Sequence, residues 1–154
     1  MTGQDSQTLT EKRSMNTTTG QVLEFALGEE TYCVSIDYVT EIVDINELTA
    51  VPNSPPHVKG VMNLRGKTTS IVDPAVVFDI DEETDPNRII VFDSDLTEND
   101  VAVGWLVDRV EQVVRVDTET VDRSPAQDEK AIRGVIKQED GSFVIWVDPG
   151  TVHS

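Results

Sequence analysis

Residues 58–62, Val-Lys-Gly-Val-Met, pass through a turn to residues 71–74, Ile-Val-Asp-Pro. The pattern returns in residues 132–136, Ile-Arg-Gly-Val-Ile, which pass through a turn to residues 146–149, Trp-Val-Asp-Pro. The two stretches are offset by 74 residues at their start and by 75 at their end. The chain therefore contains two related copies of one unit.

A second pair of similar segments lies upstream of the first pair. Residues 36–43, Ile-Asp-Tyr-Val-Thr-Glu-Ile-Val, correspond to residues 107–114, Val-Asp-Arg-Val-Glu-Gln-Val-Val, at an offset of 71 residues. Small changes in loop length explain the drift in the offset. Because solenoid repeats have periods of only about 20 to 50 residues, we expect two related small β-units and not a solenoid.

Short runs of alternating apolar residues predict half-buried strands. The runs are residues 23–27, 32–36, 90–92, 101–107 and 143–147. Turn signals separate many of them, and Asp-Gly at residues 140–141 is a strong hairpin signal. Helix is expected only as a single turn after each Asp-Pro pair, because proline suits the first helical position. The pattern predicts an all-β fold of barrels.

The predicted domain organisation has three parts. Residues 1–20 are polar and are expected to form a flexible tail, and residues 21–154 form one domain. Within that domain we expect two tandem five-stranded barrels, over about residues 21–80 and 88–148, packed side by side. Residues 79–87, with five acids and a proline, would cross between the halves. Strand exchange across this junction is expected, so the boundary is soft.

The chain is strongly acidic, which limits its partners. It has 12 Lys plus Arg against 29 Asp plus Glu, a formal net charge of −17. This balance argues against binding to nucleic acid or to anionic membranes. At 1 M salt the Debye length is about 3 Å, so such charges are screened and keep a protein hydrated. We therefore expect a protein from a halophilic archaeon.

No pattern predicts a catalytic or metal site. Cys33, His57 and His153 have no zinc or thiol-protease spacing; Cys33 is expected in the core and both histidines at the surface. The carboxylates form no distinctive pair, and phosphate-loop and Gly-x-Ser-x-Gly motifs are missing from the sequence. We expect no enzyme activity and no cofactor. The longest apolar run, residues 101–107, is too short for a membrane span of about 20 residues, so a soluble cytoplasmic protein is expected.

One turn differs between the two copies. Arg65 precedes Gly66 in the first copy, whereas residues 137–141 of the second copy, Lys-Gln-Glu-Asp-Gly, have no arginine before their glycine. An exposed ion pair worth about 0 to 1 kcal/mol would be a purely structural explanation of Arg65. The divergence favours a task for the first copy beyond folding.

The chain resembles the CheW family of chemotaxis coupling proteins from about Gln21 to Val152. The resemblance rests on the order and spacing of several short segments. They are Phe25-Ala-Leu-Gly28, Tyr32 to Ile36, Val39-Thr-Glu-Ile42, Pro52 to Pro56, Gly60-Val-Met-Asn-Leu-Arg-Gly66, Ile71-Val-Asp73 and Val103 to Val110. The family usually has Pro and then Asp-Leu-Arg after its Arg-Gly, where this chain has Ser70 and Asp73-Pro74-Ala75, and the family's longer C-terminal helix is absent or reduced to a turn.

The resemblance implies two SH3-like β-barrels with a hydrophobic groove between them. It further implies a scaffold without catalytic activity that links chemoreceptors to the histidine kinase CheA. One barrel would bind the regulatory domain of the kinase, and the groove would bind the hairpin tip of a receptor. The family's Val-x-Glu falls on Val39 and Glu41, and its Arg-Gly falls on Arg65 and Gly66.

Screening in high salt favours apolar contacts between partners. We therefore expect Val39, Ile42, Val61 and Leu64 to anchor partners, with two of the four belonging to the core. Arg65 would add a fixed polar contact. The alternative is an acidic β-barrel protein that binds a small molecule, unrelated to signalling, and a large closed apolar pocket would favour it.

Overall fold

The computed structural model describes residues 19–96, 101–123 and 131–153. The expected tail, residues 1–20, thus lies almost wholly outside the described residues, which begin at Thr19. In chain order the strands are β1 (Thr19–Leu27), β2 (Glu30–Ser35), β3 (Val39–Asp44), β4 (Val58–Leu64), β5 (Lys67–Val72), β6 (Arg88–Phe92), β7 (Ala102–Val107), β8 (Arg109–Asp117), β9 (Ile132–Lys137) and β10 (Phe143–Val147). The helices are short: η1 (Ile36–Tyr38), α2 (Pro74–Val77), η2 (Ser94–Leu96), η3 (Thr118–Thr120) and α3 (Pro149–His153).

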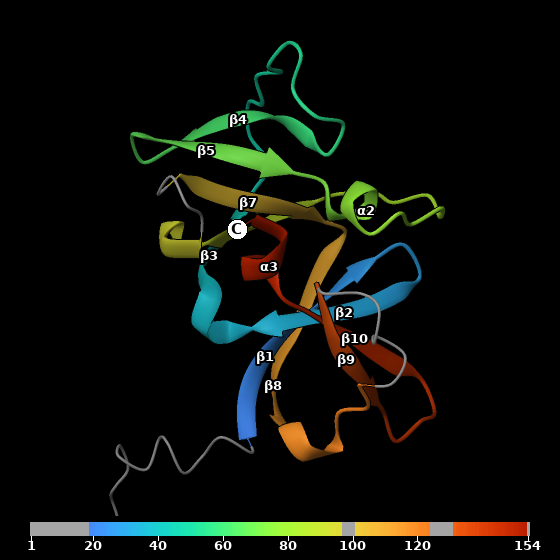
Figure 1. Ribbon diagram of the computed structural model, residues 1–154. Helices are drawn as coiled ribbons and strands as arrows, with labels where there is room; N and C mark the ends of the chain where they lie inside the picture. Colours follow the sequence, from blue (N-terminus) through green and yellow to red (C-terminus); the bar gives the residue numbers. More distant parts are fainter. Residues whose placement is uncertain (1–18, 97–100, 124–130, 154) are drawn as a thin grey trace, which may run out of the picture.

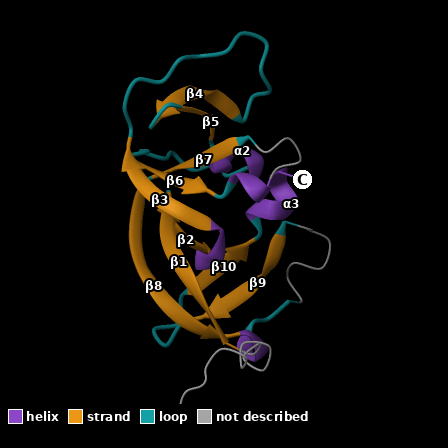
Figure 2. Ribbon diagram, turned by 90° about the vertical axis from the view of Figure 1, so that its left-hand side faces the viewer, coloured by secondary structure: helices purple, strands orange, loops and turns teal. Residues whose placement is uncertain are grey.

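The described strands form two five-stranded sheets, which confirms the predicted all-β fold of two SH3-like barrels. The first barrel has the strand order β8-β1-β2-β10-β9, and the second barrel has the order β3-β6-β7-β5-β4. The barrels lie one above the other, with α3 at their junction (Figures 1 and 2).

Each barrel takes strands from both copies of the repeat. Strands β1 to β5 of the first copy correspond in order to β6 to β10 of the second. The first barrel combines the first two strands of copy one with the last three of copy two, and the second barrel combines the remaining strands in the same order. Parallel pairing of β2 with β10 and of β5 with β7 joins the copies at matching places. The copies are thus exchanged reciprocally across a pseudo-twofold axis.

This exchange differs from the division expected at residues 80–88. Neither residues 21–80 nor residues 88–148 form one barrel, because β3 to β5 leave the first copy to pair with β6 and β7. The repeat identified two units correctly, but pairing between units is non-local and leaves no signal in the alternation of a single strand. Each copy instead divides its five strands, two and three, between the two barrels.

The largest apolar cluster lies between the barrels and not inside either one. It unites residues of both sheets around Phe25, Phe92 and Trp105, while smaller clusters around Trp146 and around Met62 fill the first and the second barrel. Strand β7 is therefore buried along its whole length, whereas its alternation predicted a half-buried strand. Both of its faces meet a core because the sheet is covered on both sides.

The two helical turns that follow Asp-Pro are confirmed. Asp73 caps α2 by accepting a hydrogen bond from the Ala75 N–H at 3.0 Å, and Asp148 accepts one from the Gly150 N–H at 3.0 Å. Proline follows each aspartate at the start of the helix, where no N–H is needed. The last described helix, α3, spans Pro149–His153.

Candidate functional site

A two-residue turn joins β4 to β5 and carries Arg65. Leu64 pairs with Lys67, and Arg65 and Gly66 between them have φ angles of +54° and +82°. Positive φ at both central residues is the geometry of a type I′ hairpin turn, which matches the twist of the strands. Glycine adopts this backbone freely, but for arginine the left-handed conformation costs about 1 to 2 kcal/mol. An arginine at position 65 therefore makes the fold less stable than a glycine with the same backbone conformation would.

Asn63 holds this turn in place. Its side-chain Oδ1 accepts a hydrogen bond from the Gly66 N–H at 2.8 Å. The bond satisfies a backbone donor at the tip of the hairpin, and it fixes the direction in which Arg65 leaves the turn. The family resemblance includes Asn63, but the sequence analysis assigned this residue no role. An asparagine shortly before a turn glycine could have predicted this side-chain hydrogen bond.

The Arg65 guanidinium lies on Glu41 of β3. Its Nη2 is 2.9 Å from Oε1 of the glutamate, and the side chains are 80% and 25% exposed. A guanidinium has five N–H donors, so this ion pair leaves most of them directed to solvent and available to a partner. The pair positions an exposed cation on an acidic protein and contributes at most about 1 kcal/mol to stability.

The predicted site residues come from opposite ends of one sheet. Val39, Glu41 and Ile42 lie on β3, while Val61 and Leu64 lie on β4, and these are the two outermost strands of the second barrel. Curling of the sheet brings the strands together, so that Glu41 and Leu64 line one hollow of about 280 Å³. The structure thereby brings together two residues that are 23 positions apart in the sequence.

Two of the four expected apolar anchors are part of the core. Val39 packs against the cluster between the barrels, and Leu64 packs against the cluster inside the second barrel. Ile42 is 41% exposed, and Val61 is partly buried at the rim of a second hollow. Ile42 is therefore the most exposed member of the set, while Val61 and Leu64 each line a hollow at the surface.

The corresponding end of the first barrel carries the opposite charge. Glu139 and Asp140 occupy the hairpin that matches Arg65-Gly66, and they line a hollow of about 540 Å³ together with Glu111. Gln112 stands where Glu41 stands in the other copy, and it donates a hydrogen bond to the buried Glu24 at 3.1 Å. The arginine–glutamate pair is thus particular to one barrel.

Cys33 and the histidines are structural groups. Cys33 is fully buried, as expected, and burial raises the pKa of its thiol, with a further contribution from Glu24. The expectation that His153 faces solvent is wrong. His57 is partly buried, and Nε2 of His153 accepts a hydrogen bond from the Trp105 indole N–H at 2.8 Å. No group of three or more potential metal ligands occurs among the described residues.

The junction between the barrels is acidic on the side where one hollow lies. Its lining includes Glu29, Glu83, Asp85 and Asp108. The Asp108 carboxylate, between β7 and β8, accepts hydrogen bonds from the N–H groups of Gly28 and Asp85, both at 3.0 Å, and so joins the β1–β2 turn to the connector, residues 79–87. This hollow is not the hydrophobic groove that the resemblance implied, and it offers little to an apolar small molecule.

Comparison with known proteins places this architecture in a family. The family model of the CheW-like domain matches residues 21–154. The chain belongs to the CheW family. It is 33% identical to the chemotaxis protein CheW of Thermotoga maritima over 130 residues, covering 83% of each chain. It is 30% identical to the chemotaxis protein CheW of Bacillus subtilis over 126 residues, covering 78% of each.

A solved structure of the CheW family has the same architecture. The crystal structure of the scaffolding protein TtCheW from Thermoanaerobacter tengcongensis matches with a TM-score of 0.71 at 28% identity, covering 83% of each chain. The match supports the two-barrel arrangement over most of the domain. No helix within the described parts of the chain is long and apolar enough to cross a membrane.

Proposed function

We propose that this chain is a non-catalytic chemotaxis scaffold that couples chemoreceptors to the histidine kinase CheA. The observation that carries the proposal is the Arg65–Glu41 pair on a CheW-family barrel. An exposed guanidinium is held at 2.9 Å from a carboxylate by a turn whose backbone disfavours arginine. Such a fixed cation, with exposed Ile42 next to Glu41 along β3, suits contact with a protein partner.

The two partners are proposed to use different parts of the molecule. The second barrel, with Arg65, Glu41, Ile42 and Val61, would bind the regulatory domain of the kinase. The junction of the barrels would bind the hairpin tip of a receptor. A scaffold that contacts both partners changes kinase activity only through preferential binding to the active assembly, so its mechanism is mass action and geometry.

We also propose that the protein acts in the cytoplasm of a halophile. The support is the net charge of −17, and only three ion pairs form among the described residues, so most carboxylates are left to solvent and salt. A small-molecule-binding barrel is the weaker candidate, since the hollows of both barrels and of their junction are lined largely by polar side chains.

Titration calorimetry in molar KCl tests the coupling role. The folded chain is titrated with the CheA regulatory domain and with the cytoplasmic fragment of a receptor, both from the same organism. Saturable binding of each partner, and a ternary complex when all three are mixed, is the expected result. Failure to bind either partner while the chain remains folded would refute the proposal.

A further inference from the structure

The chain leaves the second barrel earlier than its counterpart leaves the first. At the offset of 71 residues, Asp44 corresponds to Arg115. Strand β3 ends at Asp44, whereas β8 continues to Asp117 and pairs with Thr19 and Gly20 of β1. Val116 and Asp117 therefore extend the sheet of the first barrel, whereas the two residues that follow Asp44 are not paired in a strand.

Pro86 explains the early end of β3. The Asn87 N–H bonds the Val107 carbonyl of β7, so in the alternating pattern of a strand residue 86 would direct its N–H toward β3. Proline has no N–H to donate. The pairing of β3 with β6 accordingly stops at Asp44 and Arg88.

Because the segment after β3 leaves the sheet early, it exposes apolar side chains whose counterparts in the first barrel are buried. Ile45 is 36% exposed, but its counterpart Val116 is 7% exposed and belongs to the core of the first barrel. Leu48 is also 36% exposed, whereas Val121 packs against that core. The bridges Thr49–Val61 and Asp122–Val135 confirm that residues 48 and 121 correspond, because each precedes the bridged residue.

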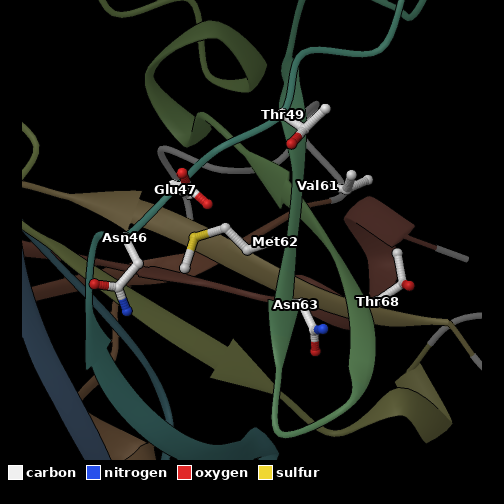
Figure 3. Close-up of a pocket in the computed structure, with 7 residues that line it drawn as sticks. All are labelled: Asn46, Glu47, Thr49, Val61, Met62, Asn63 and Thr68. Atoms are coloured by element: carbon white, nitrogen blue, oxygen red, sulfur yellow. The ribbon is translucent and has the colours of Figure 1, made fainter.

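A hollow opens where these side chains would have packed. It lies between the segment after β3 and strand β4, with Met62 directed from β4 toward Asn46 and Glu47 (Figure 3). Its volume is about 450 Å³, compared with about 210 Å³ for the hollow between β8 and β9 in the first barrel. The second barrel is thus open along the seam that the first barrel closes with its own side chains.

The edge of β4 at this seam offers free backbone groups. Val61 exchanges hydrogen bonds of 2.9 and 3.0 Å with Thr49 on the side away from β5. Asn63, two residues further along, directs its N–H and C=O to the same side, and neither has a backbone partner among the described residues. Such an edge accepts an added strand by backbone hydrogen bonding.

We propose that this seam docks an extended peptide segment of a partner protein, one that carries aliphatic side chains and at least one basic residue. The aliphatic side chains would occupy the place that Val116 and Val121 fill in the first barrel. The basic residue would face Glu47, a lining carboxylate with no partner within the described parts of the chain. The site lies beside the Arg65 turn and is independent of the coupling role.

The probe is an octapeptide based on the segment with which the chain itself closes the first barrel. Residues 115–122 are copied with their three acidic residues replaced by lysine, and the unaltered acidic octapeptide serves as the charge control. Each is titrated to millimolar concentration into the ¹⁵N-labelled full chain. The expected result is saturable shifts of the Asn46, Val61 and Asn63 amides, with the basic peptide bound about threefold more tightly than the acidic one.

Matched variants test the contacts. The double variant Ile45→Ser and Leu48→Ser is expected to bind the basic peptide about fivefold or more weakly, because a loss of about 1 kcal/mol of apolar contact corresponds to that change in affinity. Val76→Ser is the control, because Val76 is 41% exposed on α2, away from the seam. Thermal unfolding of each variant verifies that it is folded. Glu47→Gln should remove the preference for the basic peptide.

Three outcomes would overturn the proposal. The first is the absence of shifts at the seam, or shifts centred elsewhere, in the folded wild-type chain. The second is equal binding of both peptides, which would show that the seam does not prefer a basic partner. The third is a dimer in sedimentation velocity that dissociates on Ile45→Ser, since a second copy of the chain would then be the occupant.

Discussion

Trp105 and His153 are joined by a hydrogen bond between the centre of the core and the C-terminal helix. The indole N–H donates to Nε2 of His153 at 2.8 Å, although the residues are 48 positions apart. Trp105 is fully buried and contacts Phe25, Phe78 and Phe92 edge-on. Within the described residues, His153 is therefore the group that satisfies the polar atom of the central aromatic ring.

His153→Ala should destabilise the fold through Trp105. Removing the acceptor leaves a buried N–H unsatisfied, which costs about 1 to 3 kcal/mol. Chemical denaturation at pH 7.5 measures the change in the free energy of unfolding. The double variant with Trp105→Phe tests the mechanism, because the second change should cost less in the His153→Ala background than in the wild type. Equal costs in both backgrounds would contradict the prediction.

Stability should also fall on acidification because of His153. Burial, with a smaller contribution from nearby His57, lowers the pKa of this imidazole to about 4. A histidine with a depressed native pKa contributes its stability above the unfolded pKa of about 6.5 and loses it as the pH falls toward 4.

The difference in unfolding free energy between wild type and His153→Ala should therefore shrink between pH 6.5 and 4. His57→Ala should raise the pKa of His153. The free energy of unfolding of this variant should therefore depend less steeply on pH between 6.5 and 4 than that of the wild type. NMR titration of the imidazole reports the pKa directly. A pKa that does not move in His57→Ala would contradict this account of its cause.

Arg65→Ala and Glu41→Ala should weaken partner binding while the fold is kept. Loss of a charge-assisted contact at an interface is expected to cost about 1 to 3 kcal/mol, whereas loss of the exposed pair alone costs the fold at most about 1 kcal/mol. Calorimetry with the kinase regulatory domain and the receptor fragment at fixed high salt measures the effect. Arg133→Ala, in the second copy, is the control. Unchanged binding of both partners by both variants would remove these residues from the site.

Arg65→Gly separates the fold from the function at one position. Glycine relieves the left-handed strain of about 1 to 2 kcal/mol but adds chain entropy worth about 0.4 to 1 kcal/mol to the unfolded state. Arg65→Gly should therefore be more stable than Arg65→Ala, yet bind partners as weakly as Arg65→Ala does. Chemical denaturation measures the stability of both variants, and calorimetry measures their partner binding. A glycine variant less stable than the alanine variant would argue against backbone strain at the turn.

Salt should raise the thermal stability of the whole chain. Repulsion among the excess carboxylates of a chain with a net charge of −17 weakens as the Debye length falls from about 10 Å at 0.1 M to about 3 Å at 1 M. Thermal midpoints measured between about 0.1 and about 3 M KCl should increase with concentration. A flat profile would be incompatible with a fold adapted to high salt.

The sequence predicts local features of this fold better than its long-range pairing. Alternation and turns predicted most of the strands, although not β3 or β8, and Asp-Pro predicted both short helices, because these features depend on neighbouring residues. Strand exchange and the Trp105–His153 bond depend on contacts between distant segments, so periodicity did not indicate them. At the site, divergence of the repeat pointed to Arg65, whereas only the family resemblance supplied Glu41.

Reciprocal exchange of strands has a consequence for how the protein can be divided. One copy of the unit supplies two strands to one sheet and three to the other, so a half-chain cut within residues 79–87 has no complete sheet of its own. It would have to recruit another half-chain to bury its apolar faces. The protein is therefore organised as an interlocked dimer whose subunits have been fused, and the acidic connector supplies the tether that makes a bimolecular assembly step unimolecular.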